Sequence, residues 1–164
     1  METILVVDDE KNYLLVLSAV LEEEGYEVLT TVSGLEALEI QKSSDLDLVL
    51  TDMKMPGMDG IELLEQIKAN DPELPVIMMT AHGTVDKAVE AMQKGAYSYI
   101  LKPFDNERLT LYVKKAISIY QVVKENRRLR SAVESQYRFG NIIGKSKTMR
   151  DVFETIQKVA PSNA

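Results

Sequence analysis

Carboxylate, hydroxyl and ammonium side chains stand at the ends of four short apolar runs in the first hundred residues. These side chains belong to Asp8, Asp9, Thr51, Asp52, Thr80 and Lys102. Carboxylates that converge repel one another, so we expect a divalent cation to hold them together. Oxygen ligands favour Mg²⁺, which takes one or two carboxylates and keeps several water molecules.

The same residues could transfer a phosphoryl group. With Mg²⁺ bound beside it, Asp52 is free to attack phosphorus as a nucleophile. The Lys102 ammonium and the Thr80 hydroxyl would then neutralise the phosphoryl oxygens, which is nearly all the catalysis that such a transfer requires. Taken singly, each residue has an ordinary explanation, such as a helix cap. Their recurrence at the ends of four runs favours a shared site.

The apolar runs are typical of strands in a parallel sheet. They span residues 4–7, 48–50, 76–79 and 99–101, and they are rich in branched side chains without polar alternation, as strands buried on both faces are. A weaker run at 26–31 is expected to form a fifth strand at an edge. The intervening segments have helical spacing, so strands and helices are predicted to alternate five times.

This pattern predicts an α/β protein with a doubly wound, five-stranded parallel sheet of the flavodoxin-like kind and strand order 2-1-3-4-5. In such sheets ligands bind at the carboxyl ends of the strands, beside the point where the strand order reverses. The polar side chains that follow the strands are therefore expected to share one edge.

The last helix is predicted to continue beyond the sheet as an extended C-terminal linker helix. It begins after a cap at Asp105, and no Gly or Pro interrupts it from Leu109 to Val133. Residues in steps of three and four form a coiled-coil seam, namely Ile119, Val122, Asn126, Leu129 and Val133. We predict a homodimer through residues 119–133, in which Asn126 fixes the register. The alternative is an exposed connecting helix whose apolar residues contact a neighbouring domain.

Composition and charge divide the chain near residue 120. The 164 residues carry a formal net charge of −7, yet residues 1–120 hold 10 basic and 22 acidic side chains while residues 121–164 hold 9 and 4. The acidic part is a poor surface for nucleic acid. The chain has no cysteine, which excludes disulfides and thiolate sites. It has no apolar run long enough to cross a membrane and an acidic N-terminal segment unlike a signal peptide, so we expect a cytoplasmic protein.

The motifs at the strand ends resemble those of two-component response-regulator receiver domains. The matching segments are Asp8-Asp9-Glu10, Thr51 to Gly60, Thr80-Ala81 and Tyr99 to Phe104, which together cover about residues 1–120. The resemblance implies a domain that accepts a phosphoryl group from a sensor histidine kinase, and that assists its own phosphorylation and dephosphorylation without being a true enzyme.

The resemblance also assigns roles to single residues. Asp52 is implied as the phosphoacceptor, and Asp9, Asp52 and the backbone carbonyl of Lys54 as Mg²⁺ ligands, with Asp8 assisting through water. The family's switch pair corresponds to Thr80 and Tyr99: the hydroxyl follows the phosphoryl group and the aromatic ring turns inward. The bond before the proline that follows the lysine, here Lys102-Pro103, is implied to be cis.

The end of the chain resembles the start of the AAA+ domain in NtrC-like activators of sigma-54 RNA polymerase. The matching residues are Phe139 to Ser146 and the amphipathic segment from Met149 to Pro161. The resemblance divides the chain into a receiver at 1–120, a helical linker at 121–138 and the truncated start of an AAA+ sigma-54 interaction domain at 139–164. We expect the ATPase part, and the contacts with polymerase and DNA, to lie outside these residues.

Two other functions fit parts of the pattern. An Asp-nucleophile phosphatase would use the same carboxylate and Mg²⁺, but its favoured form has a second acid two residues after the nucleophile, where this chain has Lys54. A constitutive dimerisation module would need no phosphorylation, and replacement of Asp52 would leave its oligomeric state unchanged. The partner kinase, the signal and the direction of control do not follow from the sequence.

Overall fold

The computed structural model of the chain describes residues 1–81, 84–136, 138–139, 142–143, 151–152 and 154. The chain divides into two compact units, Met1–Val122 and Val123–Ala164. The sheet and the candidate site belong to the first unit, and of the helices only the last continues past its end.

Strands and helices alternate through the first unit in the predicted order. The strands are β1 (Thr3–Val7), β2 (Glu27–Thr31), β3 (Leu48–Asp52), β4 (Val76–Thr80) and β5 (Ser98–Leu101). The helices are α1 (Lys11–Glu23), α2 (Gly34–Ser43), α3 (Gly60–Asn70), α4 (Val85–Gln93) and α5 (Asn106–Gln136). All strands pair in parallel in the order β2-β1-β3-β4-β5, which confirms the predicted doubly wound sheet.

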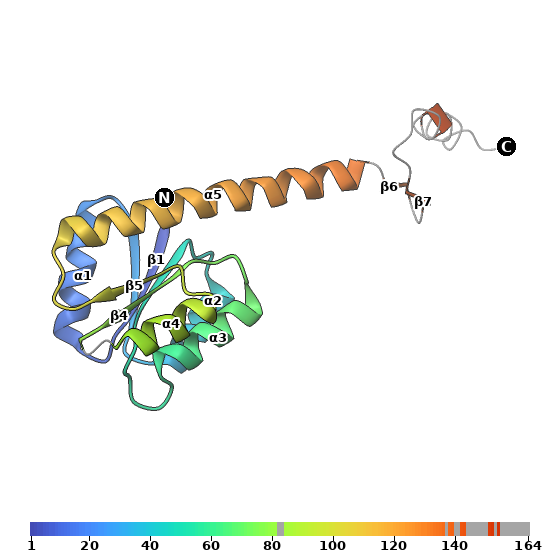
Figure 1. Ribbon diagram of the computed structural model, residues 1–164. Helices are drawn as coiled ribbons and strands as arrows, with labels where there is room; N and C mark the ends of the chain where they lie inside the picture. The colour runs from blue at the N-terminus through green and yellow to red at the C-terminus, as the bar shows by residue number, and fades with distance from the viewer. Residues whose placement is uncertain (82–83, 137, 140–141, 144–150, 153, 155–164) are drawn as a thin grey trace. The chain divides into compact units, whose positions relative to one another are not determined.

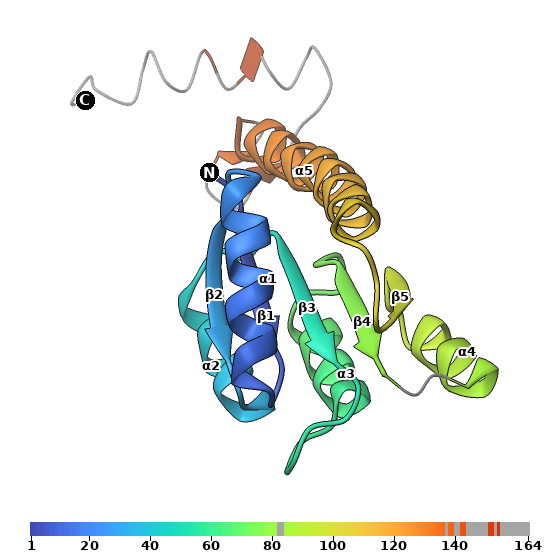
Figure 2. The same ribbon diagram turned by 90° about the vertical axis from the view of Figure 1, so that its left-hand side faces the viewer.

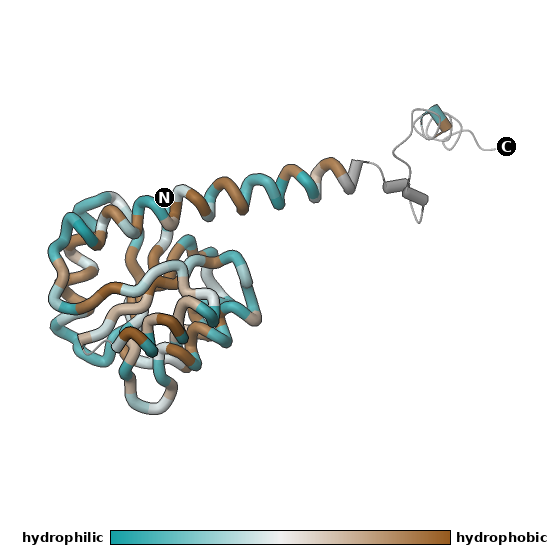
Figure 3. Tube along the Cα trace, viewed as in Figure 1, coloured by the Kyte–Doolittle hydropathy of each residue, from teal (hydrophilic) through white to brown (hydrophobic). Residues whose placement is uncertain are grey.

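The sheet separates two hydrophobic layers (Figures 1 and 2). Alternate strand residues point to opposite faces, so Ile4 and Val6 pack with apolar residues of α1 and α5, whereas Leu5 and Val7 pack with those of α2, α3 and α4. The central strands β3 and β4 are buried along their whole length. Figure 3 colours the chain by hydropathy, and brown hydrophobic stretches alternate there with teal hydrophilic ones along the helices. Because both faces are covered, the strands read as unbroken apolar runs.

The helix ends follow local sequence signals. The Asp59 side chain accepts hydrogen bonds from the N–H groups of Ile61 and Glu62, and the Glu62 side chain accepts one from the N–H of Asp59. These bonds form a capping box at the start of α3. Asp105 accepts from the N–H of Arg108 at 2.6 Å before α5, as the sequence predicts for this cap. After α1 and α4 the backbone has positive φ angles, 91° at Gly25 and 94° at Gly95. Residues other than glycine rarely adopt such angles, so glycine is favoured at these helix ends.

The early part of α5 is fixed to the first unit. Leu109, Val113 and Ala116 are buried against one face of the sheet. One turn further on, the Tyr120 hydroxyl donates to Asp71 Oδ2 at 2.9 Å, and the side-chain amide of Gln121 donates to Asp47 Oδ1 at 2.8 Å. Both acceptors lie in loops that precede strands, so these bonds hold α5 at the amino-terminal edge of the sheet.

Further along, the seam residues Ile119, Val122, Leu129 and Val133 are each at least half exposed. In the second unit, β6 (Arg138–Phe139) pairs with β7 (Ile142–Ile143) in an antiparallel arrangement. Most of the segment predicted as an AAA+ start, 139–164, lies outside the described residues. Within the part of the chain that the structure describes, no helix has the length and apolar composition needed to cross a membrane.

Candidate functional site

Two carboxylates meet where the strand order reverses. Asp8 directly follows β1, and Asp52 is the last residue of β3. These strands are neighbours, with Val7 opposite Thr51 in the register, so both side chains reach the same edge. The chain continues from β1 to β2 on one side and returns to β3 on the other, which places the pair at the switch point of the sheet.

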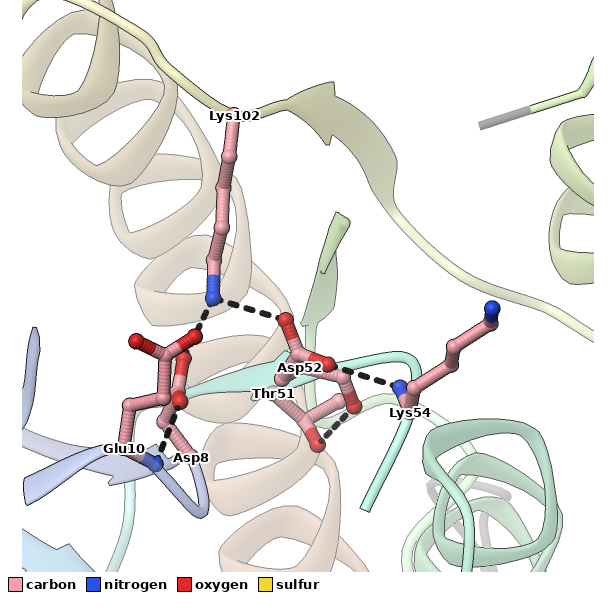
Figure 4. A network of polar contacts seen from close by, with 6 residues as sticks. All are labelled: Asp8, Glu10, Thr51, Asp52, Lys54 and Lys102. Atoms are coloured by element: carbon pink, nitrogen blue, oxygen red, sulfur yellow. Dashed lines mark hydrogen bonds and ion pairs between the residues drawn. The ribbon is translucent and has the colours of Figure 1, made fainter. Parts of the chain in front are cut away.

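The ammonium of Lys102 bridges the two carboxylates (Figure 4). Its Nζ lies 2.5 Å from Asp8 Oδ2 and 2.7 Å from Asp52 Oδ1. The Asp8 side chain is fully buried, and only 9% of the Lys102 side chain is exposed. Burial lowers the pKa of Lys102, but the hydrogen bonds and charges of Asp52 and Asp8 outweigh it and raise the pKa above its usual value. Lys102 is therefore a cation held by two anions.

Backbone N–H groups donate the remaining hydrogen bonds to both carboxylates. The Glu10 N–H donates to Asp8 Oδ1 at 3.0 Å, and the Lys54 N–H donates to Asp52 Oδ2 at 2.7 Å. The Thr51 hydroxyl donates to the Asp52 carbonyl at 3.0 Å (Figure 4). Every carboxylate oxygen of the pair thus has a donor. Lys102 and two N–H groups therefore offset part of the repulsion that the sequence reasoning assigned to a divalent cation.

Asp9 is separated from this pair. Its side chain is exposed and lines a hollow of about 680 Å³ together with Met53, Lys54 and residues of α3 and α4. Three carboxylates were expected to converge, but no set of three acidic or histidine side chains within the described residues is arranged to hold a metal. Asp8 and Asp9 are consecutive, so one turns inward and the other outward at the end of the strand.

The residues nevertheless suit Mg²⁺ by their donor chemistry. Asp8, Asp9, Asp52 and the Lys54 carbonyl offer only hard oxygen atoms, at or directly after the carboxyl ends of β1 and β3. Mg²⁺ retains several waters and needs only one or two protein carboxylates, so a closed protein cage is unnecessary. The Lys54 backbone N–H donates to Asp52 Oδ2, which holds the loop that carries the Lys54 carbonyl beside this carboxylate.

Thr80 and Tyr99 lie on the neighbouring strands β4 and β5. Thr80 is buried at the end of β4, and the Tyr99 hydroxyl is buried without a hydrogen bond of acceptable geometry among the described residues. Burial raises the pKa of Tyr99, and the nearby Thr80 side chain opposes this rise. The two side chains predicted as a switch pair are therefore neighbours, with the tyrosine hydroxyl directed inward. The Lys102-Pro103 bond is cis, as the resemblance implied.

Two aromatic residues of the site were not predicted. The ammonium of Lys102 lies 4.0 Å from the centroid of the Tyr13 ring, and Phe104 contacts that ring edge-on. Tyr13 lies four residues after Asp9 and outside the matching segments, and Phe104 ends the matching segment Tyr99 to Phe104 but was given no role there. Aromatic residues in such places are usually core residues, so the pattern alone does not assign them to the site.

Gly60 brings the backbone of α3 close behind Asp52. Its N–H donates to the carbonyl of Met53 at 2.9 Å. A Cβ at this position would overlap the carbonyl oxygen of Asp52 and lie 2.9 Å from the Cα of Met53. Glycine is thus required here by close approach of two backbone segments, and the loop that carries Lys54 is closed against the strand end.

The strand order and the buried acidic pair at the switch point define a flavodoxin-like α/β domain with a polar site at its carboxyl edge. The response regulator receiver domain family matches residues 4–114. The chain therefore belongs to this family, as the motifs indicated.

Individual relatives extend the similarity beyond the receiver. The chain is 42% identical over 158 residues to the DNA-binding transcriptional regulator NtrC of Escherichia coli K12, an alignment that covers 96% of this chain and 33% of NtrC. It thus spans about a third of the length of the curated relatives it matches. The structure is similar to NtrX from Brucella abortus in complex with ADP, at 35% identity and TM-score 0.73, over 100% of this chain and 35% of NtrX.

A solved receiver structure is similar over part of the chain. The solution structure of the beryllofluoride-activated NtrC4 receiver domain dimer is 43% identical, with TM-score 0.71, and the match covers 73% of this chain and 99% of that one. These similarities agree with the NtrC-like regulators that the sequence resembled.

Proposed function

We propose that this chain is the signal-receiving part of a two-component transcriptional regulator and that Asp52 accepts a phosphoryl group from a sensor histidine kinase. One observation carries the proposal: the Asp52 carboxylate lies at the sheet's switch point, 2.7 Å from a buried lysine ammonium that also contacts Asp8. A cation fixed beside a nucleophilic carboxylate can stabilise the negative charge on the oxygens of an incoming phosphoryl group, which favours reaction of the carboxylate with phosphorus.

The transfer forms one bond to phosphorus and breaks another. An Asp52 carboxylate oxygen attacks phosphorus in line with the donor's phosphorus–nitrogen bond. As the oxygen–phosphorus bond forms, the imidazole nitrogen of the donor histidine leaves with the bonding electron pair, and the product is an aspartyl phosphate. Lys102 and Thr80 contribute the ammonium and the hydroxyl that contact the phosphoryl oxygens, which is electrostatic stabilisation rather than proton transfer.

Asp8, Asp9, Asp52 and the Lys54 carbonyl are the proposed Mg²⁺ ligands. When bound there, Mg²⁺ would supply positive charge beside the phosphoryl oxygens and offset the surplus of carboxylates. The exposed Asp9 and the hollow that it shares with Lys54 give the ion and its waters a route from solvent.

Thr80 and Tyr99 are proposed to convert phosphorylation into a change at the surface. Their adjacency and the inward hydroxyl of Tyr99 support this role. The adjoining helix α4 buries only Ala91 and leaves Val85, Val89 and Met92 exposed. A helix held by so few buried residues can shift at low energetic cost, which suits the surface of α4 and β5 to report the state of Asp52.

The output is proposed to be a change in dimer or assembly state that controls an AAA+ sigma-54 activator. The exposed seam at 119–133 supports a homodimer through the linker, and the NtrC relative is a DNA-binding transcriptional regulator. On this proposal residues 1–120 are the receiver, 121–138 the linker and 139–164 the start of the AAA+ domain. Sigma-54 polymerase and DNA would be partners of the full-length cytoplasmic protein, with no membrane contact.

Chemical trapping of the phosphorylated residue tests this function. The chain would be phosphorylated by a phosphorylated histidine kinase with Mg²⁺ and then reduced with borohydride, which converts an aspartyl phosphate to homoserine. Peptide mass mapping is expected to find homoserine at position 52 alone, and none in Asp52→Asn. Homoserine at Asp8 or Asp9 instead, or at no position, would contradict the assignment.

A further inference from the structure

An aromatic pair covers the lysine of the site. Tyr13 lies in the first turn of α1, where its N–H donates to the Glu10 carbonyl at 2.9 Å. The face of its ring lies 4.0 Å from Lys102 Nζ, measured to the ring centroid. The Phe104 ring meets the Tyr13 ring at an angle of 80°, with 6.1 Å between centroids. Tyr13 and Phe104 thus form a small aromatic cluster at the phosphoacceptor edge.

The ring is held in place by its surroundings. Tyr13 and Phe104 are half-buried and pack against the core layer that includes Leu14 and Leu109. The edge-on contact is a favoured arrangement of two aromatic rings. The position of the Tyr13 ring is therefore set by the fold and does not depend on Lys102 alone.

The contact completes the environment of the ammonium. Lys102 Nζ has three N–H donors, and two of its contacts are Asp8 and Asp52. The ring face carries negative electrostatic potential, so it attracts the side of the ammonium that the carboxylates leave open and excludes water from it. Burial and the neighbouring carboxylates raise the pKa of Tyr13 despite the opposing charge of Lys102, so the phenol remains neutral at neutral pH.

We propose that Tyr13 is a positioning residue for phosphoryl transfer: its ring keeps the Lys102 ammonium directed at Asp52 and shielded from water. This inference rests on the proposed function of Asp52. Without the ring, the flexible lysine side chain gains access to water and spends less time in the geometry that stabilises the transferred group.

A graded series at position 13 separates electrostatic attraction from mere filling of space. Phenylalanine, 4-fluorophenylalanine and 3,4,5-trifluorophenylalanine keep the ring while weakening the potential of its face, and Tyr13→Leu removes the ring. Tyr112→Leu is the matched control, because Tyr112 packs against the same core layer and lies under Arg108, on a different helix from Tyr13. The rate constant for phosphorylation by acetyl phosphate with Mg²⁺ would be measured by intact mass.

The expected order follows the strength of the cation–ring attraction. The rate constant of Tyr13→Phe should stay within about twofold of wild type. It should fall with 4-fluorophenylalanine and fall further with 3,4,5-trifluorophenylalanine. In Tyr13→Leu the rate constant should be about fivefold lower than in wild type, the size expected for a partly buried cation–ring contact. Tyr112→Leu should retain the wild-type rate constant. Equal rate constants across the ring series, or an unchanged rate in Tyr13→Leu, would overturn the proposal.

A second measurement tests the contact between the Tyr13 ring and Lys102 independently of phosphorylation. The ring current of Tyr13 should shift the NMR signals of the Lys102 ε-methylene protons, assigned by their loss in Lys102→Arg. These signals should move toward random-coil values in Tyr13→Leu and not in Tyr112→Leu, and no movement would overturn the proposed contact. If wild type shows the shift yet forms no adduct on Asp52, the proposed function fails, and the positioning role fails with it although the contact exists.

Discussion

At the scale of single residues, the candidate site depends on how its charges are compensated. Asp8 is fully buried and would be costly as an isolated anion. The Lys102 ammonium and the N–H of Glu10 compensate it, and Asp52 has an equivalent arrangement with Lys102 and the N–H of Lys54. The site is therefore an ion triad in which each member relies on the others.

Removing the cation should destabilise the fold in a pH-dependent way. Lys102→Met should lower the free energy of unfolding by about 3 kcal/mol at pH 7, because two close carboxylates lose their shared partner. The folded-state pKa of Lys102 is raised, so its contribution is fully present below the unfolded-state pKa and declines as the pH rises through the folded value. Urea unfolding should show that the difference in free energy of unfolding between wild type and Lys102→Met persists at neutral pH and shrinks above about pH 10.5.

A double variant provides the control for this prediction. In Asp8→Asn/Lys102→Met, one of the repelling charges is absent, so much of the lost stability should return. A difference between wild type and Lys102→Met that already disappears near pH 8 would contradict the raised pKa, and a double variant less stable than the single one would contradict the repulsion.

Gly60 provides a second test at this scale. Gly60→Ala should lower the free energy of unfolding by about 2 kcal/mol, because the new Cβ would collide with backbone atoms of Asp52 and Met53. Thermal and urea unfolding would measure the loss. The comparison is Gly34→Ala, whose Cβ would have side-chain atoms of Met58 at 3.0–3.1 Å as its nearest neighbours instead of backbone atoms. Equal effects of the two substitutions would count against the backbone collision.

Sequence reasoning succeeds for some site residues and fails for others, for a physical reason. Asp52 is the last residue of β3 and Lys102 directly follows β5, and the parallel topology brings such positions together. Asp8 and Asp9 both follow β1, and no local pattern tells which side chain turns inward. Tyr13 is placed against Lys102 by the packing of α1 on the sheet, which is a tertiary effect.

At the scale of elements, unbroken apolar runs and helix caps were sufficient to predict every strand and helix of the first unit. The edge strand β2 gave the weakest signal because three of its five residues are Glu or Thr, and only Thr31 is buried. The attachment of α5 was not predictable. Tyr120 and Gln121 read as ordinary helix positions, yet they hydrogen-bond to loops far away in the sequence.

The attachment of α5 predicts a local stability effect. Tyr120→Phe should lower the free energy of unfolding by about 1 kcal/mol, because Asp71 loses a donor while the buried ring is kept. Hydrogen exchange should quicken in α5 around Tyr120 more than around Leu109. Tyr112→Phe, on the same helix, has no hydroxyl hydrogen bond to any described residue and should leave both quantities unchanged. The same exchange rates in all three proteins would contradict the role of this bond.

At the scale of the whole molecule, the exposed seam on α5 predicts self-association. Wild type should sediment as a dimer at tens of micromolar, and Val133→Glu should sediment as a monomer because a charge would enter the apolar seam. Leu111→Glu is the control: Leu111 is also exposed on α5 but lies outside residues 119–133. A monomeric wild type would contradict dimerisation through the seam. If Leu111→Glu were monomeric and Val133→Glu dimeric, the dimer contact would lie in the first unit instead.

The same experiment distinguishes a receiver from a constitutive dimerisation module. Phosphorylation should change the sedimentation of wild type and leave that of Asp52→Asn unchanged. The charge composition of the chain changes near residue 120, and the division into two compact units falls after Val122.

The central claim is that Asp52 is a phosphoacceptor, and intact mass after incubation with acetyl phosphate and Mg²⁺ tests it most directly. The account predicts one phosphoryl adduct on wild type, none on Asp52→Asn and none when a chelator removes Mg²⁺. No adduct on wild type, or an adduct that survives Asp52→Asn, would contradict it.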